Sequence, residues 1–311
     1  YPIVGNYLLR AIREVLGAHI ATDQVIPAWA AAYGQLADIL IGAEKGIYAA
    51  NAQAEGGWQG ARRFVVAGKQ AESVEVTSFI LCPEDGGKVL VHQSGQFIGL
   101  RLEIDGKEVR RNYSLSQAAN GESLRISVKR EQGGVVSSHL HDKVQVGDVL
   151  EVFAPAGFFV LDSSDKPLVF MAAGVGITPI MAMLEQALKT QRPITLIHCS
   201  RSPAVQPFRA QLLALAQQHP QLKLRLAYEH EAVELPMQNV QVVAGMADAR
   251  LLQSWLPEDK DVQAYFLGPV GFMRVAQQAL QQAGVPAAQC HYEFFGPAQA
   301  LADVAPALWS S

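Results

Sequence analysis

The sequence predicts a multidomain protein of mixed α+β and α/β class, in which helices, an antiparallel β-barrel and a parallel α/β domain follow one another. Apolar residues recur at helical spacing in residues 1–48, with a period of two in residues 58–160, and in alternating strand and helix patterns from residue 166. The length of 311 residues fits about two full domains. Half of the residues are hydrophobic and 17% are charged, which excludes a disordered or low-complexity chain.

The first region is predicted to form two amphipathic helices. Their apolar stripes are Val4, Leu8, Ile12 and Val15, then Trp29, Tyr33, Leu36 and Leu40. Thr22 and Asp23 are expected to cap the second helix, and Pro27 then falls in its first turn, where a missing N–H is tolerated. Because two helices cannot enclose a core, these stripes must pack against something else.

Residues 58–160 are predicted to form an antiparallel barrel. Turns such as Asp85-Gly86-Gly87 and Asp105-Gly106 separate short strand-like runs. The runs are Arg63–Val66, Val74–Phe79, Gly99–Ile104 and Leu124–Val128. Several short strands with few helices are typical of a barrel.

From residue 166 onward, alternating strands and helices indicate a parallel α/β sheet. The uncharged stretch Pro167–Leu184 is close to the length of a membrane span, but Gly174, Gly176 and Pro179 divide it. We therefore expect a buried strand, a turn and the start of a helix there, and no membrane span. The predicted strands are Leu168–Met171, Ile194–Cys199, Leu222–Tyr228 and Ala264–Leu267.

The turn after the first parallel strand is a candidate phosphate site. Its residues are Gly174, Val175, Gly176, Ile177, Thr178 and Pro179. A glycine turn before a helix lets the backbone approach a pyrophosphate, and the helix N-terminus offers free N–H groups. The usual dinucleotide fingerprint has a third glycine where Pro179 stands. Taken alone, the turn fits a dinucleotide site or a tight structural connection.

The barrel region holds a second candidate site. Its residues are Arg111, Asn112, Tyr113 and Ser114, followed by Gly133, Gly134 and Ser137. An arginine can pair with a diphosphate, a tyrosine can stack on a flat ring, and a hydroxyl can hydrogen-bond a ring nitrogen. The Gly133-Gly134 turn before a short helix is an anion site of the same type as the first. The alternative is a surface strand with an exposed arginine.

Taken in order, these motifs resemble those of the ferredoxin-reductase-like flavoenzymes, which pair an FAD-binding barrel with a nicotinamide-binding α/β domain. The order is R-x-Y-S from Arg111, G-G-x-x-S from Gly133, G-x-G-x-T-P from Gly174, then Gly268-Pro269 and Glu293-Phe294-Phe295-Gly296-Pro297. The start of the chain, from Tyr1-Pro2-Ile3-Val4-Gly5 to Tyr48, resembles the last globin helices of bacterial flavohemoglobins, which are nitric oxide dioxygenases. The resemblance covers residues 1–297.

The resemblance implies three parts and a tail. Residues 1–50 correspond to the C-terminal part of a globin-like domain, 57–161 to an FAD-binding β-barrel and 166–297 to an NAD(P)-binding α/β domain. Residues 298–311 form a tail without an assigned role. The resemblance therefore implies that the chain begins within a globin domain, and the missing starting methionine agrees with this expectation.

The resemblance also implies cofactor ligands. FAD is expected on Arg111, Asn112, Tyr113 and Ser114, with Gly133, Gly134 and Ser137, and with Phe97 where a tyrosine is more usual. The dinucleotide is expected on the Gly174–Pro179 turn, helped by Gly268 and Pro269. Phe294, Phe295, Gly296 and Pro297 are expected to lie against the flavin. Ser114 and Glu293, the latter near the flavin edge, are the expected catalytic residues for hydride transfer from nicotinamide to flavin.

In that family, electrons then pass singly to haem iron, where bound O2 meets NO and nitrate forms. Tyr1 and Glu44 match the family's hydrogen-bonded pair that orients the histidine below the iron, and we count them as catalytic. Haem b is expected in the full-length protein, whereas its ligand histidine lies outside this chain. No metal site is expected, because His139-x-His141 has no evident third ligand.

Charge and cysteine content define the expected partners and location. The formal net charge of −4 argues against nucleic-acid binding. Cys82, Cys199 and Cys290 are too few for a disulfide framework, which indicates a reducing cytoplasm. We expect a cytoplasmic monomer whose partners are the small molecules NAD(P)H, O2 and NO.

The residues after Leu222–Tyr228 indicate which nicotinamide cofactor is used. Glu229-His230-Glu231 offers carboxylates, which accept from a ribose 2′-hydroxyl and repel a 2′-phosphate. Arg201 is the one nearby group expected to assist a phosphate. We therefore predict NADH, with NADPH as the alternative.

Two functions stay open at this level. The first is the reductase of a flavohemoglobin with part of its globin, acting in nitric oxide dioxygenation. The second is a stand-alone NAD(P)H:flavin oxidoreductase that donates electrons to a separate acceptor protein.

Overall fold

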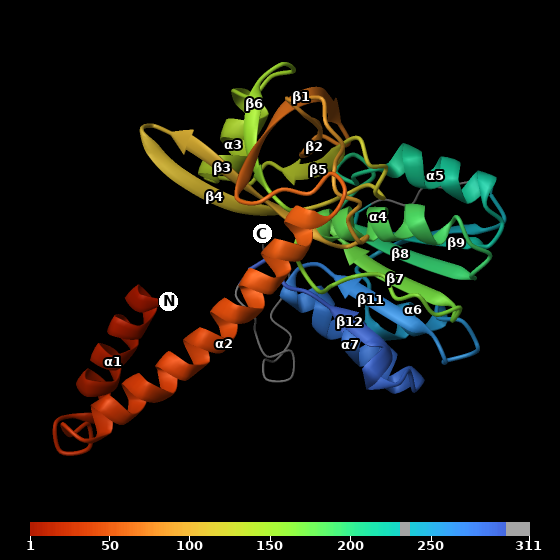
Figure 1. Cartoon of the computed structure of the whole chain (residues 1–311). Coiled ribbons are helices and arrows are strands. Elements are labelled where there is room, and N and C mark those ends of the chain that lie inside the picture. Colours follow the sequence, from red (N-terminus) through yellow and green to blue (C-terminus); the bar gives the residue numbers. More distant parts are fainter. Residues whose placement is uncertain (231–236, 297–311) are drawn as a thin grey trace. The chain divides into compact units, whose positions relative to one another are not determined.

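The structure, a computed structural model, describes residues 1–230 and 237–296 (Figure 1). The chain divides into two units, residues 1–59 and 60–311. Pro297 and Glu231, two residues of the expected cofactor sites, lie outside the described residues.

The first unit is a pair of helices, α1 (Pro2–Leu16) and α2 (Val25–Gln53). The Tyr33 hydroxyl donates a hydrogen bond to the backbone oxygen of Tyr1 at 2.9 Å. Gly5 is buried beneath the same ring, because a Cβ there would lie 2.6 Å from a Tyr33 ring carbon. The predicted cap is wrong in position: α2 begins after Gln24, and Thr22 contributes only a long bond of 3.4 Å from the Val25 amide.

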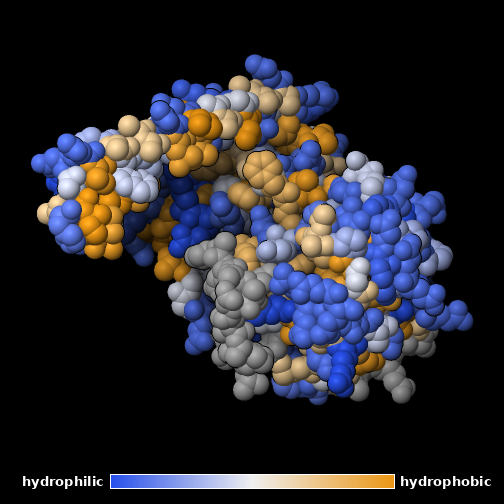
Figure 2. Space-filling model, turned by 90° about the horizontal axis from the view of Figure 1, so that it is seen from below, coloured by the Kyte–Doolittle hydropathy of each residue, from blue (hydrophilic) through white to orange (hydrophobic). Residues whose placement is uncertain are grey.

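Both helices carry apolar side chains that are exposed. The exposed fraction is 72% for Ile3, 49% for Trp29 and 69% for Ile39, and Ala37 is the buried residue of α2. Figure 2 shows such side chains gathered on the helices of this unit. Two helices thus leave their stripes uncovered, as the sequence predicts.

One helix of the described residues, α2, is long and apolar enough to cross a membrane by length and composition alone. The sequence predicts no membrane span in the long uncharged stretch Pro167–Leu184. That stretch folds as a buried strand, a turn and a helix in the second unit.

The antiparallel sheet of the second unit has the strand order β4-β3-β6-β1-β2-β5. A bridge between Leu115, just after β4, and Ile126 in β5 joins the two edges, which gives the predicted barrel. Its elements are β1 (Ala61–Ala71), β2 (Val76–Pro83), β3 (Phe97–Ile104), β4 (Lys107–Ser114), β5 (Leu124–Lys129), α3 (Val135–Asp142) and β6 (Val149–Phe153). Asp105 and Gly106 both have positive φ, as a two-residue hairpin requires.

The second sheet is parallel, with the order β10-β9-β8-β7-β11-β12. Its strands are β7 (Leu168–Ala173), β8 (Ile194–Ser200), β9 (Leu222–Tyr228), β10 (Val240–Ala244), β11 (Gln263–Leu267) and β12 (Cys290–Tyr292). The helices are α4 (Ile177–Ala187), α5 (Arg209–Gln218), α6 (Ala249–Ser254) and α7 (Val270–Ala283), with short 3₁₀ turns at Gly174–Gly176 and Ala287–Gln289.

Helices cover both faces of the parallel sheet (Figure 1). One core packs α4 and α5 on the sheet, and a second core packs α6 and α7 on the opposite face. The helices that follow the neighbouring strands β7 and β11 therefore leave on opposite sides. In open α/β sheets, such a reversal of winding marks the crevice where ligands bind, at the carboxyl ends of the strands.

The Glu185 carboxylate of α4 contacts both the barrel and the parallel domain. It accepts from the Ala118 amide at 2.8 Å and from the Arg125 guanidinium at 3.1 Å, both in the barrel. Gln211 of α5 donates to the same group at 3.0 Å. Glu185 and Arg125 are mostly buried, so these charge-assisted bonds are shielded from water.

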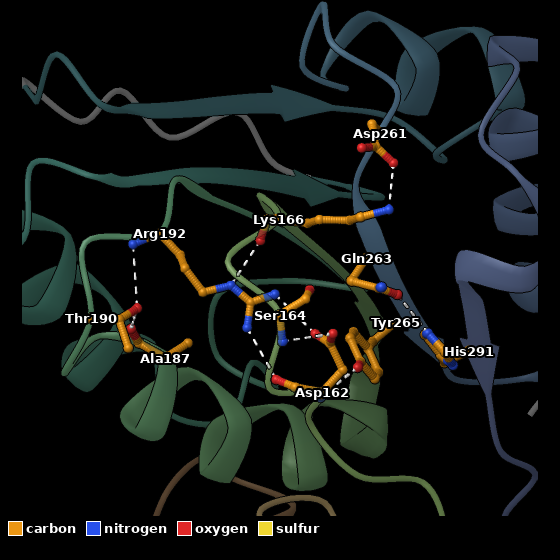
Figure 3. A network of polar contacts seen from close by, with 10 residues as sticks. All are labelled: Asp162, Ser164, Lys166, Ala187, Thr190, Arg192, Asp261, Gln263, Tyr265 and His291. Atoms are coloured by element: carbon orange, nitrogen blue, oxygen red, sulfur yellow. Dashed lines mark hydrogen bonds and ion pairs between the residues drawn. The ribbon is translucent and has the colours of Figure 1, made fainter.

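The segment that leads from the barrel into β7 is fixed by a second polar network (Figure 3). The nearly buried Arg192 donates to the Asp162 carboxylate at 3.0 Å and to the Lys166 backbone oxygen at 2.7 Å. The Tyr265 hydroxyl of β11 accepts from the Asp162 amide at 2.9 Å. Burial alone would raise the pKa of Asp162, but its bonds from Ser164 and Arg192 hold that pKa below its ordinary value.

We predict that Asp162→Asn lowers the free energy of unfolding at pH 7 by about 1–2 kcal/mol, because the bond from Arg192 loses its charge on one side. Because its pKa is lowered in the folded state, the Asp162 carboxylate stabilises the protein at pH values above its unfolded-state pKa of about 4. This stabilisation is lost as the pH falls through the lower pKa of the folded state. Urea unfolding at pH 7 and pH 3 measures the difference between the two proteins. That difference should shrink at pH 3; an equal difference at both pH values would contradict the assignment.

Candidate active site

A cavity of about 730 Å³ lies at the carboxyl edge of the parallel sheet, and we call it the carboxyl-edge cavity. Segments that follow β7, β8, β9, β10 and β11 line it, together with barrel residues. Its size is that of a cofactor site, and its place is the one expected from the strand order. The lining includes Glu75, Lys129, Glu131, Gly174, Val175, Gly176, Cys199, Ser200, Arg201, Glu229, Gly268, Pro269, Phe294, Phe295 and Gly296.

The predicted phosphate turn forms one wall of this cavity. Gly174 has a φ of +53°, which favours glycine, and a Cβ on Gly176 would lie 2.4 Å from the Leu267 backbone oxygen. Glycine is thus required for the turn to pack against the end of β11. Ile177, Thr178 and Pro179 are buried outside the cavity lining, and the Thr178 hydroxyl donates to the Val175 oxygen at 3.1 Å.

The second predicted turn, Gly268-Pro269, follows β11 and lines the cavity beside the first. Because β7 and β11 are paired neighbours, both turns present their backbone at the same place. A Cβ on Gly268 would lie 3.0 Å from the Cβ of Ala173. Two helix N-termini, those of α4 and α7, begin at these turns and can together stabilise an anion.

A buried hydrogen-bond chain supports the phosphate turn from below. The Tyr228 hydroxyl donates to Gln206 Oε1, and Gln206 Nε2 donates to His198 Nδ1 at 3.1 Å. His198 Nε2 therefore carries the proton and donates to the Gly174 backbone oxygen at 3.0 Å. Burial lowers the pKa of His198 to about 4, so the ring is neutral at pH 7.

Two small side chains at the end of β8 face the cavity. The buried Ser200 hydroxyl has no hydrogen-bond partner in the described part of the chain, so it is free to bind a ligand. Burial, with a smaller contribution from Glu229, raises the pKa of the Cys199 thiol to about 12. Cys199 is thus protonated at neutral pH and is no nucleophile.

Charged side chains in the cavity are mostly paired. Arg201, after β8, forms an ion pair with Glu75 of the barrel. Lys129 Nζ lies 3.2 Å from Glu131 Oε1, so these two side chains also form an ion pair. Glu229 follows β9, and its Oε2 lies 3.7 Å from His230 Nε2.

The segment after β12 closes one side of the cavity. Phe294, Phe295 and Gly296 line it, and the Phe294 ring packs edge-on against Tyr292 with centroids 5.8 Å apart. Glu293 is half-buried and outside the lining, and burial raises the pKa of its carboxyl. Such a group is a candidate proton carrier.

The predicted FAD residues of the barrel lie outside this cavity. In β4, Arg111 is exposed and Tyr113 is half-buried, and the two side chains share one face of the strand. Burial raises the pKa of Tyr113 to about 12, so its hydroxyl stays protonated. Ser114 is buried and pairs with Phe97 across the sheet, and the Phe97 ring packs on Gly157.

The other predicted FAD residues form the N-terminus of α3. A Cβ on Gly134 would lie 2.5 Å from Ser137 Oγ, so a larger residue there would displace the Ser137 side chain. The Ser137 hydroxyl accepts from the Glu131 amide at 3.2 Å and donates to the Gly134 oxygen at 3.3 Å. Ser137 thus fixes the loop, while the first amides of α3 have no side-chain cap.

In the first unit, the Tyr1 hydroxyl donates to Glu44 Oε1 at 2.6 Å. This hydrogen bond is the main reason that the pKa of Tyr1 is raised to about 12. The sole histidine of this unit, His19, is exposed in the turn after α1. The residues of this unit therefore do not form a haem-iron site by themselves.

The sequence did not predict several cavity residues. Gly245, Met246 and Ala247 were missed because β10 was missed, although the rule that sites gather after parallel strands could have found them. Glu75, Lys129 and Glu131 come from the barrel, and no local signal links them to the sheet.

Comparison with known proteins agrees with this architecture. The model of the oxidoreductase FAD-binding domain matches residues 63–161, and that of the oxidoreductase NAD-binding domain matches residues 170–278. A flavohemoprotein of Pseudomonas aeruginosa is 58% identical over 301 residues, which cover 97% of this chain and 76% of that protein. The chain belongs to the flavohemoprotein family.

Two solved structures of the flavohemoprotein type resemble the chain. The flavohem-like FAD/NAD-binding domain of a nitric oxide dioxygenase from Vibrio cholerae has 38% identity and a TM-score of 0.70, covering 76% of this chain and 99% of that one. A flavohemoglobin from Malassezia yamatoensis with bound FAD and haem has 26% identity and a TM-score of 0.80, covering 94% of this chain and 73% of that one.

The family resemblance, the fold class and the FAD and NAD cofactors predicted from the sequence are thereby confirmed. The chain is an oxidoreductase of the flavohemoprotein family, an NAD(P)H-dependent flavin reductase. The individual site residues and the domain boundaries stay predictions.

Proposed function

We propose that this chain takes hydride from NADH and supplies electrons for the conversion of NO and O2 to nitrate. The observation that carries the proposal is the extent of the match. Flavohemoprotein relatives cover 97% of the chain and so include the helices of the first unit. The related reductase domain of Vibrio cholerae is named as part of a nitric oxide dioxygenase.

The residues present fit a dinucleotide at the carboxyl-edge cavity. Two observations support this placement. A buried hydroxyl without a partner, such as that of Ser200 among the described residues, costs free energy unless a ligand binds it. The two glycine turns allow the backbone to approach a pyrophosphate closely. When bound, the nicotinamide supplies a hydride and the flavin accepts it. Gly174, Gly176 and Gly268 orient the pyrophosphate, and Phe294 and Phe295 exclude water from one side of the cavity.

The barrel residues fit FAD. The exposed Arg111 guanidinium, whose Nη1 donates to the neighbouring Arg110 oxygen, can pair with a diphosphate, and the uncapped amides of α3 offer a second anion site. Tyr113 gives a stacking surface with a protonated hydroxyl, and Ser114 donates to a ring nitrogen. We assign proton exchange near the flavin edge to Glu293.

In the first unit, we assign Tyr1 and Glu44 to orienting the histidine ligand of a haem. Because the residues of this unit do not by themselves form a haem-iron site, the steps assigned to this chain end at the flavin. Haem b belongs to the full-length protein in this proposal.

The alternative is a stand-alone flavin reductase for a separate acceptor protein. The match of the first-unit helices to flavohemoproteins favours the dioxygenase proposal over it. We further propose a monomer in the cytoplasm that binds no nucleic acid, with α2 as a globin helix. Free thiols at Cys82, Cys199 and Cys290 and a net charge of −4 support this proposal.

The reductase is tested by mixing the purified, FAD-loaded chain with NADH and ferricyanide and following the loss of ferricyanide absorbance. We expect turnover that depends on both FAD and NADH. Its absence would refute the proposed function. NADH-dependent NO consumption, measured with an electrode in cells that express the gene encoding this chain, distinguishes the dioxygenase from the stand-alone reductase.

Ser114→Ala is expected to slow flavin reduction by NADH about 10- to 100-fold, because the flavin loses a hydrogen-bond donor that is stronger in the transition state. Stopped-flow absorbance of the flavin measures this rate. Ser123→Ala is the matched control, since the Ser123 hydroxyl accepts from the side chains of Gln117 and Asn120 and is not one of the predicted FAD residues. A Ser114→Ala rate within twofold of the unsubstituted protein would remove Ser114 from the mechanism.

A further inference from the structure

We propose that Glu75 determines the preference for NADH over NADPH, because its carboxylate neutralises Arg201 inside the carboxyl-edge cavity. This inference rests on the proposed use of NADH in that cavity. It adds a specificity-determining residue from the barrel, on a different domain from the parallel sheet that carries the phosphate turns.

The geometry holds Glu75 and Arg201 together. Arg201 directly follows β8, and Glu75 directly precedes β2. Their side chains form an ion pair, and both residues line the cavity. Beside them, the Val74 amide donates to the Ala204 backbone oxygen at 3.2 Å. This backbone bond fixes the two segments against each other, so the carboxylate stays at the guanidinium.

Arg201 is the group that a 2′-phosphate would need. In dinucleotide-binding α/β domains, an arginine near the end of a strand accommodates the 2′-phosphate, whereas a carboxylate accepts from the 2′-hydroxyl of NADH. The Arg201 side chain is 54% exposed and lines the cavity, so it is accessible to a ligand there. However, the ion pair with Glu75 already compensates the positive charge of Arg201.

The other charges of the cavity reinforce this effect. Among the described lining residues, the second cation, Lys129, is also paired, with Glu131. Glu229 adds a carboxylate that lies beside His230, and no lysine or arginine of the described residues forms an ion pair with it. A phosphate monoester brings roughly two negative charges at pH 7. Such a phosphate would meet no unpaired cation among these lining residues and would be repelled by their carboxylates. The uncharged 2′-hydroxyl of NADH is not repelled in this way.

The inference is tested with Glu75→Gln, which keeps the shape and removes the charge. The ratio of kcat/KM for NADPH to kcat/KM for NADH is measured on the FAD-loaded chain with ferricyanide as acceptor. We expect this ratio to rise about tenfold, the gain of one charge-assisted hydrogen bond between Arg201 and the 2′-phosphate. In the double variant Glu75→Gln/Arg201→Gln, the ratio should return to that of the unsubstituted protein.

The matched control is Glu84→Gln, which removes one charge from an ion pair with Arg63 on the barrel surface. The inference is overturned if Glu75→Gln leaves the ratio unchanged, if Glu84→Gln raises it equally, or if the double variant keeps the gain. A common rise in kcat/KM for both cofactors overturns it too, because Arg201 would then bind a group that both contain. Failure of the proposed function is distinguishable, since the unsubstituted chain would then not oxidise NADH at all.

Discussion

Gly176→Ala is expected to lower kcat/KM for NADH about 100-fold. The new Cβ would lie 2.4 Å from the Leu267 oxygen and 2.7 Å from its carbonyl carbon. Both atoms are backbone of β11 and cannot rotate away, so the phosphate turn must move. A displacement of about 1 Å in a group that positions a substrate can cost a factor of 100 in rate.

Steady-state NADH oxidation with ferricyanide measures this loss, and flavin absorbance shows whether the barrel is intact. Gly34→Ala in α2 is the control, because no heavy atom lies within 4 Å of its added Cβ. Gly268→Ala should be less severe, since its closest contact is a side-chain Cβ at 3.0 Å. If Gly176→Ala retains kcat/KM within fivefold, the turn does not place the dinucleotide.

His198→Leu is expected to destabilise the protein by about 2–4 kcal/mol and to raise KM for NADH. The substitution leaves the Gly174 oxygen and the Gln206 amide without partners in a buried site, and each such group costs about 1–3 kcal/mol. The turn that carries Gly174 then loses its support. Urea unfolding and steady-state kinetics measure the two effects.

His198→Gln distinguishes support of the turn from simple packing. Its amide nitrogen can stand near the position of Nε2 and donate to Gly174, so KM should recover more than with His198→Leu. The pKa of His198 is lowered to about 4, below the unfolded value of about 6.5. Between these values the unfolded chain binds the additional proton, so stability falls as the pH drops from about 6.5 to 4. His198→Gln should weaken that fall; an identical pH dependence in both proteins would contradict a neutral, buried histidine.

Sequence patterns predicted the fold where the periodicity was strong. β3 alternates between buried and less buried residues, whereas β7 and β8 are short runs buried at every position and bounded by turns. The glycine turn was placed directly after the run of β7. Four strands were not among the predicted runs: β4 and β6 of the barrel, and β10 and β12 of the parallel sheet. β12 has three residues, and β10 is an edge strand with a mixed burial pattern, so neither carries a readable period.

Side-chain roles within the site were harder to predict, because one residue type serves several purposes. Ser137 and Thr178 stay predicted cofactor residues; in the structure their hydroxyls bond the backbone of their own loops, a contact that no motif indicates. Ser200 carries the free hydroxyl instead, and it follows a strand without any motif. Glu75 meets Arg201 only because two domains fold against each other, a contact 126 residues apart in the chain.

The Glu185 contacts restrict how the two cofactor domains can move. Helix α4 begins at the phosphate turn and, near its other end, binds the barrel through Ala118 and Arg125. Its 11 residues form a rigid spacer of about 17 Å. A hinge motion between the barrel and the parallel domain would have to break charge-assisted bonds before it moved the turn. Electron transfer from this domain pair is therefore expected to proceed without a large rotation of the parallel domain against the barrel.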